Sequence, residues 1–239
     1  NASLTYPEQK EAVIKQVNLN IAAGEKIAIV GKIASGKTSL LRIITGLYDP
    51  SEGSVKIDKS DITHMHPDDI RNHIGVVMQI PMLFSGTLKE NLLMGNPNAT
   101  DKEMIAAAKL ANVDEIASSL SDGYDTVLAE GGKELSGGQR QAICIARAFV
   151  GDPKIIIMDE PSSAMDSGSE QQLLEKLKDR LVNKTLILIT HRGTLLSLVS
   201  RVVAFDNGRI VADGPKEKVL QAATKQPPQK PQEESQDAR

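Results

Sequence analysis

Aromatic residues and cysteines are scarce in this sequence. It contains three Tyr, three Phe and no Trp, and Cys144 is its single cysteine. One thiol excludes an internal disulfide and fits a reducing compartment, and we expect it to be buried in a helix. The net charge is also small, at -3 from 28 basic and 31 acidic residues. Such a balance gives the protein no overall positive electrostatic potential that would attract polyanions, so nucleic acid is not an expected partner.

Long hydrophobic runs are missing as well. No apolar stretch approaches the roughly 18 to 20 residues that a membrane-spanning helix needs, and no signal peptide pattern opens the chain. If the protein works at a membrane, we therefore expect another segment to span it. The 239 residues, 40% of them hydrophobic, are enough to bury a sizeable core and are typical of a globular domain.

Short aliphatic runs that end in polar residues are present instead. The runs KIAIVG (26–31), KIIIMDE (154–160) and TLILITH (185–191) are typical of strands buried on both faces of a parallel sheet. Helical patterns lie between them, including an apolar stripe at Leu173, Leu174, Leu177 and Leu181. Because open α/β sheets bind ligands at the carboxyl ends of their strands, we expect the polar ends to form a site.

The middle and the end of the chain have different patterns. Residues 86–120 are rich in helix signals, with a capping-box spacing from Thr100 to Glu103, and show no strand signals. This pattern predicts a helical lobe inserted into the sheet domain. From residue 221 the sequence is polar with three prolines, which predicts a folded domain over 1–220 and a disordered tail over 221–239.

A phosphate-binding motif follows the first of these runs. The pattern G-x-x-x-x-G-K-[ST] is matched by Gly31, Gly36, Lys37 and Thr38. Backbone N–H groups of such a loop surround phosphates, the lysine reaches the β and γ oxygens, and the hydroxyl can ligate Mg²⁺. The alternative is a plain glycine turn, which the strand–loop–helix context disfavours.

Two acids and a histidine end the other two runs. Asp159 at a strand end can hold Mg²⁺, and the adjacent Glu160 can polarise an attacking water. The alternative for this pair is two acids in a surface loop. His191 ends the third run, where a lone histidine is often structural.

Together these segments resemble the nucleotide-binding domains of ATP-binding cassette (ABC) proteins. GKIASGKT resembles the Walker A motif, IIIMDE the Walker B motif, and LSGGQ (135–139) the signature motif. Gln79 resembles the Q-loop glutamine, Asp166 the end of the D-loop, and His191 the switch histidine. The resemblance covers roughly residues 3–220.

The resemblance implies an α/β fold: a P-loop NTPase (RecA-like) core with a mostly parallel sheet, a small N-terminal antiparallel β subdomain, and a helical subdomain inserted at about residues 80–150. It implies ATP and Mg²⁺ as ligands and catalytic roles for Lys37, Gln79, Glu160 and His191. Magnesium would be held by Thr38, Gln79 and Asp159. The implied nucleotide contacts are Tyr6, Gly31, Lys32, Ile33, Ala34, Ser35, Gly36, Lys37, Thr38, Ser39, Ser136, Gly137, Gly138, Gln139 and Asp166.

Tyr6 stands where the family places an aromatic ring that stacks on the base. Stacking tolerates any base, so the preference for ATP comes from the resemblance alone. The family also implies that two copies pair head to tail, with each ATP between the Lys37 loop of one copy and Ser136–Gly138 of the other. The signature helix start would then be incomplete until the partner's γ-phosphate meets its N–H groups.

Two alanines depart from the family pattern. Ala34 and Ala129 replace glycines, and a methyl group at a position with positive φ costs roughly 1 kcal/mol. Either these backbones adopt ordinary conformations or the nucleotide is held differently.

The sequence around Glu130 is similar to exporters rather than importers. The non-catalytic residues of segments 68–88, 162–174 and 191–220 are similar to bacterial type I secretion ATPases of RTX toxins and adhesins. This similarity implies a six-helix membrane domain earlier in the same polypeptide, exported polypeptides and secretion partners. It implies a place at the cytoplasmic face of the bacterial inner membrane, with the isolated domain soluble.

Other functions remain open at this stage. One alternative is an exporter of lipids, drugs or peptides. Another is a non-transport ABC ATPase of DNA repair or translation, although no coiled-coil heptads follow Gln79 and the chain carries one cassette. A regulatory cassette without hydrolysis would lack Glu160 or His191, and both are present.

Overall fold

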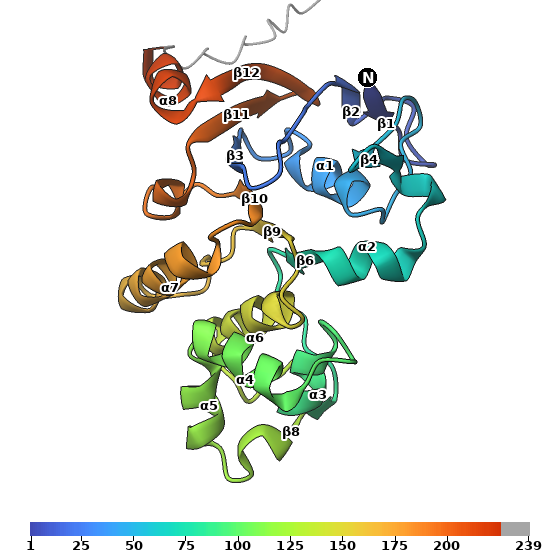
Figure 1. Cartoon of the computed structure of the whole chain (residues 1–239). Coiled ribbons are helices and arrows are strands. Elements are labelled where there is room, and N and C mark those ends of the chain that lie inside the picture. Colours follow the sequence, from blue (N-terminus) through green and yellow to red (C-terminus); the bar gives the residue numbers. More distant parts are fainter. Residues whose placement is uncertain (226–239) are drawn as a thin grey trace, which may run out of the picture.

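A six-stranded sheet forms the centre of the molecule (Figure 1). The computed structural model describes residues 1–225. The strand order is β12-β11-β3-β10-β9-β6. Their bounds are β3 (Lys26–Val30), β6 (Ile74–Val77), β9 (Ile155–Asp159), β10 (Thr185–Ile189), β11 (Arg201–Asp206) and β12 (Arg209–Pro215). Neighbouring strands are parallel except β11 and β12, which confirms the mostly parallel sheet.

The three aliphatic runs form β3, β10 and β9, which lie side by side. Ile189 pairs with Ile29 on one side and with Asp159 on the other. Because these strands are parallel and in register, the residues that follow them emerge at one edge of the sheet. The side chains of β3 alternate between two cores, with Ala28 facing one and Ile27 and Ile29 facing the other. The sheet is therefore covered on both faces, as the continuous apolar runs predict.

Helices from distant parts of the chain cover the sheet. Helix α1 (Lys37–Ile44) follows β3, and α7 (Ser167–Arg180) follows β9. The predicted stripe of α7 is confirmed, since Leu173, Leu174, Leu177 and Leu181 are all buried. Near the carboxyl end, η3 (Leu195–Leu198) precedes β11 and α8 (Lys216–Lys225) packs on β11 and β12.

A helical lobe separates β6 from β9, on the side of the molecule away from α1 (Figure 1). It contains α3 (Leu88–Leu93), α4 (Asp101–Leu110), α5 (Val113–Ser119), η2 (Gly123–Asp125) and α6 (Gly137–Phe149). The capping box of Thr100 and Glu103 is confirmed, and Cys144 is buried in α6. The expectation of no strands was wrong in one detail, because β7 (Gly86–Thr87) pairs with β8 (Val127–Leu128).

Small antiparallel strands lie at the N-terminal side. Strand β1 (Ala2–Leu4) pairs with β2 (Ile14–Val17), and β4 (Lys56–Ile57) pairs with β5 (Ser60–Asp61). The short helices η1 (Ile62–His64) and α2 (Pro67–His73) lead into β6. These pairs confirm the small antiparallel β subdomain.

The chain remains helical beyond residue 220, where the folded domain was expected to end. Helix α8 continues to Lys225, so the tail cannot begin at residue 221, and residues 226–239 lie outside the described residues. Among residues 1–225, no helix has the length and hydropathy that crossing a bilayer requires.

The two alanines that replace family glycines differ in backbone conformation. Ala34 adopts a φ of 62°, in the left-handed region, whereas Ala129 is not among the residues with positive φ. The first of the two possibilities therefore holds for Ala129 only. Ala34 carries a strained backbone in the loop between β3 and α1, because its Cβ crowds the following carbonyl oxygen.

Ala34→Gly should stabilise the protein. Relief of the left-handed strain, about 1–2 kcal/mol, exceeds the extra unfolded-state entropy of glycine, about 0.4–1 kcal/mol. We expect Tm to rise by about 1–4 °C in thermal unfolding. Ala129→Gly is the matched control and should lower Tm, because no strain is relieved there. If Ala34→Gly raises Tm no more than Ala129→Gly does, the proposed backbone strain at Ala34 is wrong.

Candidate functional site

The loop between β3 and α1 offers a helix N-terminus to an anion. A Cβ at Gly31 would lie 2.0 Å from the carbonyl oxygen of Phe205, so only glycine fits this turn. Gly36 is the N-cap of α1 and provides no side-chain acceptor for the first turn. The N–H groups of that turn have no partner within the helix, and the helix dipole favours negative charge there. Ile33 stands at the exposed tip of the loop, with 92% of its surface accessible.

Lys37 points its ammonium group into this loop. Its Nζ donates to the carbonyl oxygens of Gly31 at 2.8 Å and Lys32 at 2.7 Å. Burial lowers the pKa of Lys37, while the negative charges of Asp159 and Glu160 act in the opposite direction. The loop thus holds a cation at its centre, as phosphate binding requires, and two carboxylates lie near this cation.

A hydroxyl and a carboxylate meet next to the lysine. Thr38 Oγ1 donates to Asp159 Oδ2 at 3.0 Å. Burial raises the pKa of the Asp159 carboxyl, and the hydrogen bond from Thr38 opposes this effect. Both groups supply the hard oxygen ligands that Mg²⁺ prefers. Residues 1–225 contain no cluster of three or more His, Cys, Asp or Glu able to hold a metal. The pair instead fits Mg²⁺, which usually keeps waters and substrate phosphates as its other ligands.

Glu160 stands at the carboxyl end of β9 in a strained conformation. Its φ is 46°, and its N–H donates to the carbonyl oxygen of Ile189 at 2.8 Å. Carboxylate atom Oε2 faces the Thr190 hydroxyl at 3.2 Å and the His191 backbone N–H at 3.4 Å. Strained backbone of this kind is common at functional positions.

The other carboxylate oxygen of Glu160 is an unused acceptor. Oε1 is buried and has no hydrogen-bond partner within the described part of the chain. His191 Nε2 lies 3.6 Å from it, beyond hydrogen-bond distance, with its side chain 59% exposed. A buried acceptor without a partner is costly, so this oxygen suits a water molecule as donor. Thr190 was missed by sequence reasoning, although its place directly before His191 was the available signal.

Gln79 is exposed just after β6, next to β9 in the sheet. Its proposed roles in catalysis and magnesium binding stay predictions, because no hydrogen bond joins its side chain to Thr38 or Asp159.

Tyr6 lies beside the first turns of α1. Its hydroxyl donates to Ser39 Oγ at 3.0 Å and accepts from Arg42 Nη1 at 3.0 Å. Its ring meets the Tyr48 ring edge to face, with centroids 5.0 Å apart, and the Arg42 guanidinium lies over both rings. Sequence reasoning found Tyr6 and Ser39 but missed Arg42 and Tyr48, since nothing local links them. The stacking of Tyr6 on a base remains a prediction.

The signature residues begin α6, and part of the helix start is already satisfied. Ser136 Oγ accepts from the Gln139 backbone N–H at 3.1 Å, and the Ser136 N–H donates to Gln139 Oε1 at 2.8 Å. This capping box satisfies the N–H groups of Ser136 and Gln139 only. Helix geometry gives the N–H groups of Gly137 and Gly138 no acceptor within the helix, so these two are left for a ligand.

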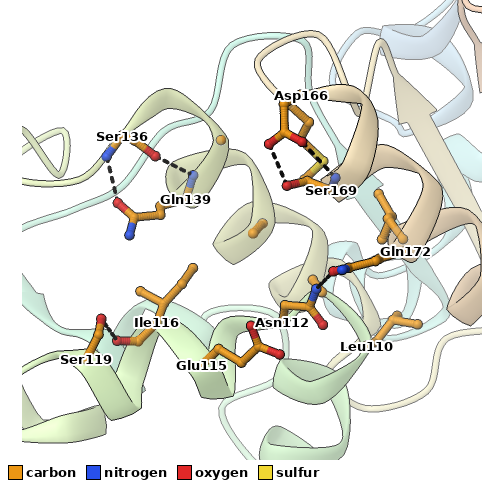
Figure 2. Close-up of a pocket in the computed structure, with 15 residues that line it drawn as sticks. Leu110, Asn112, Glu115, Ile116, Ser119, Ser136, Gln139, Asp166, Ser169 and Gln172 are labelled. Atoms are coloured by element: carbon orange, nitrogen blue, oxygen red, sulfur yellow. Dashed lines mark hydrogen bonds between the residues drawn. The ribbon is translucent and has the colours of Figure 1, made fainter.

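A cavity of about 350 Å³ lies beside the start of α6 (Figure 2). Its walls come from the α4–α5 junction and from the first turns of α6 and α7. Asp166 lines it and caps α7, with Oδ1 accepting from the N–H groups of Gly168 and Ser169 at 2.9 Å each. The Ser169 hydrogen bonds lower the pKa of Asp166.

The predicted site residues thus form two groups in one chain. Residues 31–39 gather with Asp159, Glu160 and His191 at the sheet edge. Ser136, Gly138, Gln139 and Asp166 line the cavity, to which residues 31–39 contribute nothing. Helices α1 and α6 lie in different parts of the molecule (Figure 1).

Comparison with known proteins gives matches over most of the chain. The ABC transporter family model matches residues 14–163. A putative multidrug export ATP-binding/permease protein of Staphylococcus aureus is 39% identical over 214 residues, covering 90% of this chain and 37% of that protein. P-glycoprotein 14 of Caenorhabditis elegans is 37% identical over 221 residues, covering 92% of this chain and 17% of that protein. The chain therefore spans well under half the length of these relatives.

A solved structure agrees with the sequence matches. The structure of a bacterial Atm1-family ABC exporter with ATP bound superimposes with a TM-score of 0.87 at 33% identity, covering 93% of this chain and 39% of that chain. The loop at Lys37, the acids after β9 and the helix start at Ser136 all lie within the segment that the family model matches. The chain belongs to the ABC transporter family, as its ATPase domain.

Proposed function

We propose that this chain is the ATP-hydrolysing motor of an exporter and that it works as a head-to-tail pair. The observation that carries the proposal is the separation of the two groups of site residues within one chain. The family resemblance implies that a second anion-binding face completes the phosphate loop and its hydrolytic residues, and the N–H groups of Gly137 and Gly138 offer such a face elsewhere in the chain. A second copy, turned head to tail, would present that face to the Lys37 loop.

Within one such site the residues divide the chemistry. Lys37 and the α1 N-terminus would bind the phosphates of ATP, and Thr38 and Asp159 would hold Mg²⁺, which supplies positive charge against the developing negative charge. Glu160 Oε1 would accept a hydrogen bond from the attacking water and draw its proton. Hydrolysis yields ADP and phosphate. The γ-phosphate that joined the two copies is then no longer bonded to the nucleotide, so the contact between the copies weakens.

The exporter would carry small molecules or lipids. The relatives described above are named as multidrug export and Atm1-family proteins, and this supports the alternative of a lipid, drug or peptide exporter over type I protein secretion. The non-catalytic residues of segments 68–88, 162–174 and 191–220, which resemble secretion ATPases, are the one feature that favours the second candidate.

A membrane domain would precede this chain in a longer polypeptide, because the relatives are much longer than the matched region. The ATPase domain would then lie at the cytoplasmic face of the membrane. Transport of a labelled drug or lipid by the longer polypeptide, in vesicles, would test the choice between the two kinds of cargo.

Lys37→Ala should weaken ATP binding. Removing a charged partner of the phosphates costs about 1.5–3 kcal/mol, so we expect affinity to fall by about 10- to 100-fold. Isothermal titration with ATP and Mg²⁺ measures this directly. Lys102→Ala, at an exposed position on α4, is the control and should bind as the unmodified chain does. Equal affinity for the two variants would refute the role of Lys37.

Glu160→Gln should bind ATP, hydrolyse it at least about 100-fold more slowly, and accumulate as a dimer. The amide keeps the shape of the side chain but cannot take a proton. Size-exclusion chromatography with light scattering, with and without ATP, reports the dimer. Glu175→Gln, on the exposed side of α7, should hydrolyse normally. Only monomer for Glu160→Gln at saturating ATP would count against the shared site.

A further inference from the structure

One charged pair close to the hydrolytic residues has no part in the mechanism above. Glu170 in α7 is 4% exposed, and Arg192 directly follows His191. Arg192 Nη1 donates to Glu170 Oε2 at 2.5 Å. Only the Glu170 carboxylate is buried, since the Arg192 side chain is 36% exposed, and the desolvation of Glu170 together with solvent screening at Arg192 makes this pair weak support for stability. Its presence therefore calls for another explanation.

Arg192 also contacts the segment that leads into α7. Its Nη2 donates to the carbonyl oxygen of Ser163 at 3.4 Å, so one guanidinium holds both Glu170 and residue 163. Glu170 itself is fixed to the first turn of α7, with its N–H bonded to the Asp166 carbonyl oxygen at 3.0 Å. Helix α7 is in turn anchored by its buried leucines. The guanidinium thus ties the loop after β10 to a rigid helix.

The backbone of Arg192 leads to the carboxylate of Glu160. The Arg192 N–H donates to Thr190 Oγ1 at 3.1 Å, and that hydroxyl donates to Glu160 Oε2 at 3.2 Å. The same carboxylate oxygen faces the His191 N–H. The orientation of the unused oxygen Oε1 therefore depends on where the loop of residues 190–192 lies.

The segment held by Arg192 also touches the signature helix. A Cβ on Gly138 would lie 3.2 Å from the carbonyl oxygen of Ala164, so α6 begins against this segment. Residues 163–165 are therefore packed between the start of α6 and the guanidinium. A displacement of the start of α6 would therefore be transmitted to the Arg192 guanidinium through residues 163–165, and a displacement of the guanidinium would be transmitted to α6.

We infer that Arg192, held by Glu170, is a positioning residue for ATP hydrolysis: it fixes the loop of Thr190 and His191 and thereby the direction of the Glu160 carboxylate. Its guanidinium bonds Glu170 and Ser163, so its effect on hydrolysis would pass through this loop. This inference rests on the proposed function, since it concerns hydrolysis at that site.

The test measures ATPase kinetics of the 239-residue chain carrying Arg192→Gln, Arg192→Lys or Glu170→Gln. Arg192→Gln should lower kcat at least tenfold and leave KM for ATP within twofold, because the Lys37 loop is untouched. Arg192→Lys keeps a charge for Glu170 and should recover part of kcat. Lys178→Gln breaks an exposed ion pair with Glu175 on the same helix and should leave kcat unchanged. Thermal unfolding verifies that each variant is folded at the assay temperature.

A kcat within twofold of the unmodified chain for folded Arg192→Gln and Glu170→Gln would overturn the inference. So would a parallel rise of KM, which would indicate general disruption of the site. If Arg192→Gln does not fold, Arg192→Lys and Glu170→Gln decide by the same criteria. An unmodified chain that shows no ATPase activity and no ATP binding would instead defeat the proposed function, so the two failures are distinguishable.

Discussion

The parallel, in-register pairing of β3, β10 and β9 is the constraint on which the site depends. The pairing of Ile189 with both Ile29 and Asp159 places the ends of all three strands at one level of the sheet. The phosphate loop, the acids Asp159 and Glu160, and the loop of His191 therefore emerge side by side. A shift of one strand by a single residue would turn alternate side chains to the other face and separate these groups.

The site includes features that are costly to the stability of the folded chain. Ala34 and Glu160 both have positive φ, and Glu160 keeps a buried oxygen without a partner among the described residues. Such costs persist where the surrounding structure over-determines the conformation. Here the aliphatic cores on both faces of the sheet hold the strand ends in place. Glu160 directly follows β9, and Ala34 lies in the loop that follows β3.

The helical lobe has a different role in this arrangement. It contributes nothing to the group around Lys37, yet it carries Ser136 on a helix whose first turn is only half satisfied by its capping box. The lobe meets the sheet domain through the segment at Ala164, against which α6 begins. Residues 163–165 thus lie between the start of the signature helix α6 and the loop of residues 190–192 that faces Glu160.

The sequence by itself determined the elements and motifs whose chemistry is local. The strands within the runs 26–31, 154–160 and 185–191, the loop at Lys37 and the capping box of Thr100 and Glu103 could be predicted, because each depends on residues close together in the chain. Tertiary structure alone decided the pairing of Thr38 with Asp159, the contacts of Tyr6 with Arg42 and Tyr48, and the link of Glu170 to Arg192. These contacts join residues from different elements, so their geometry follows from how the sheet and helices pack. The conformation at Ala34 was decided in the same way, since the fold overrides the local preference of an alanine.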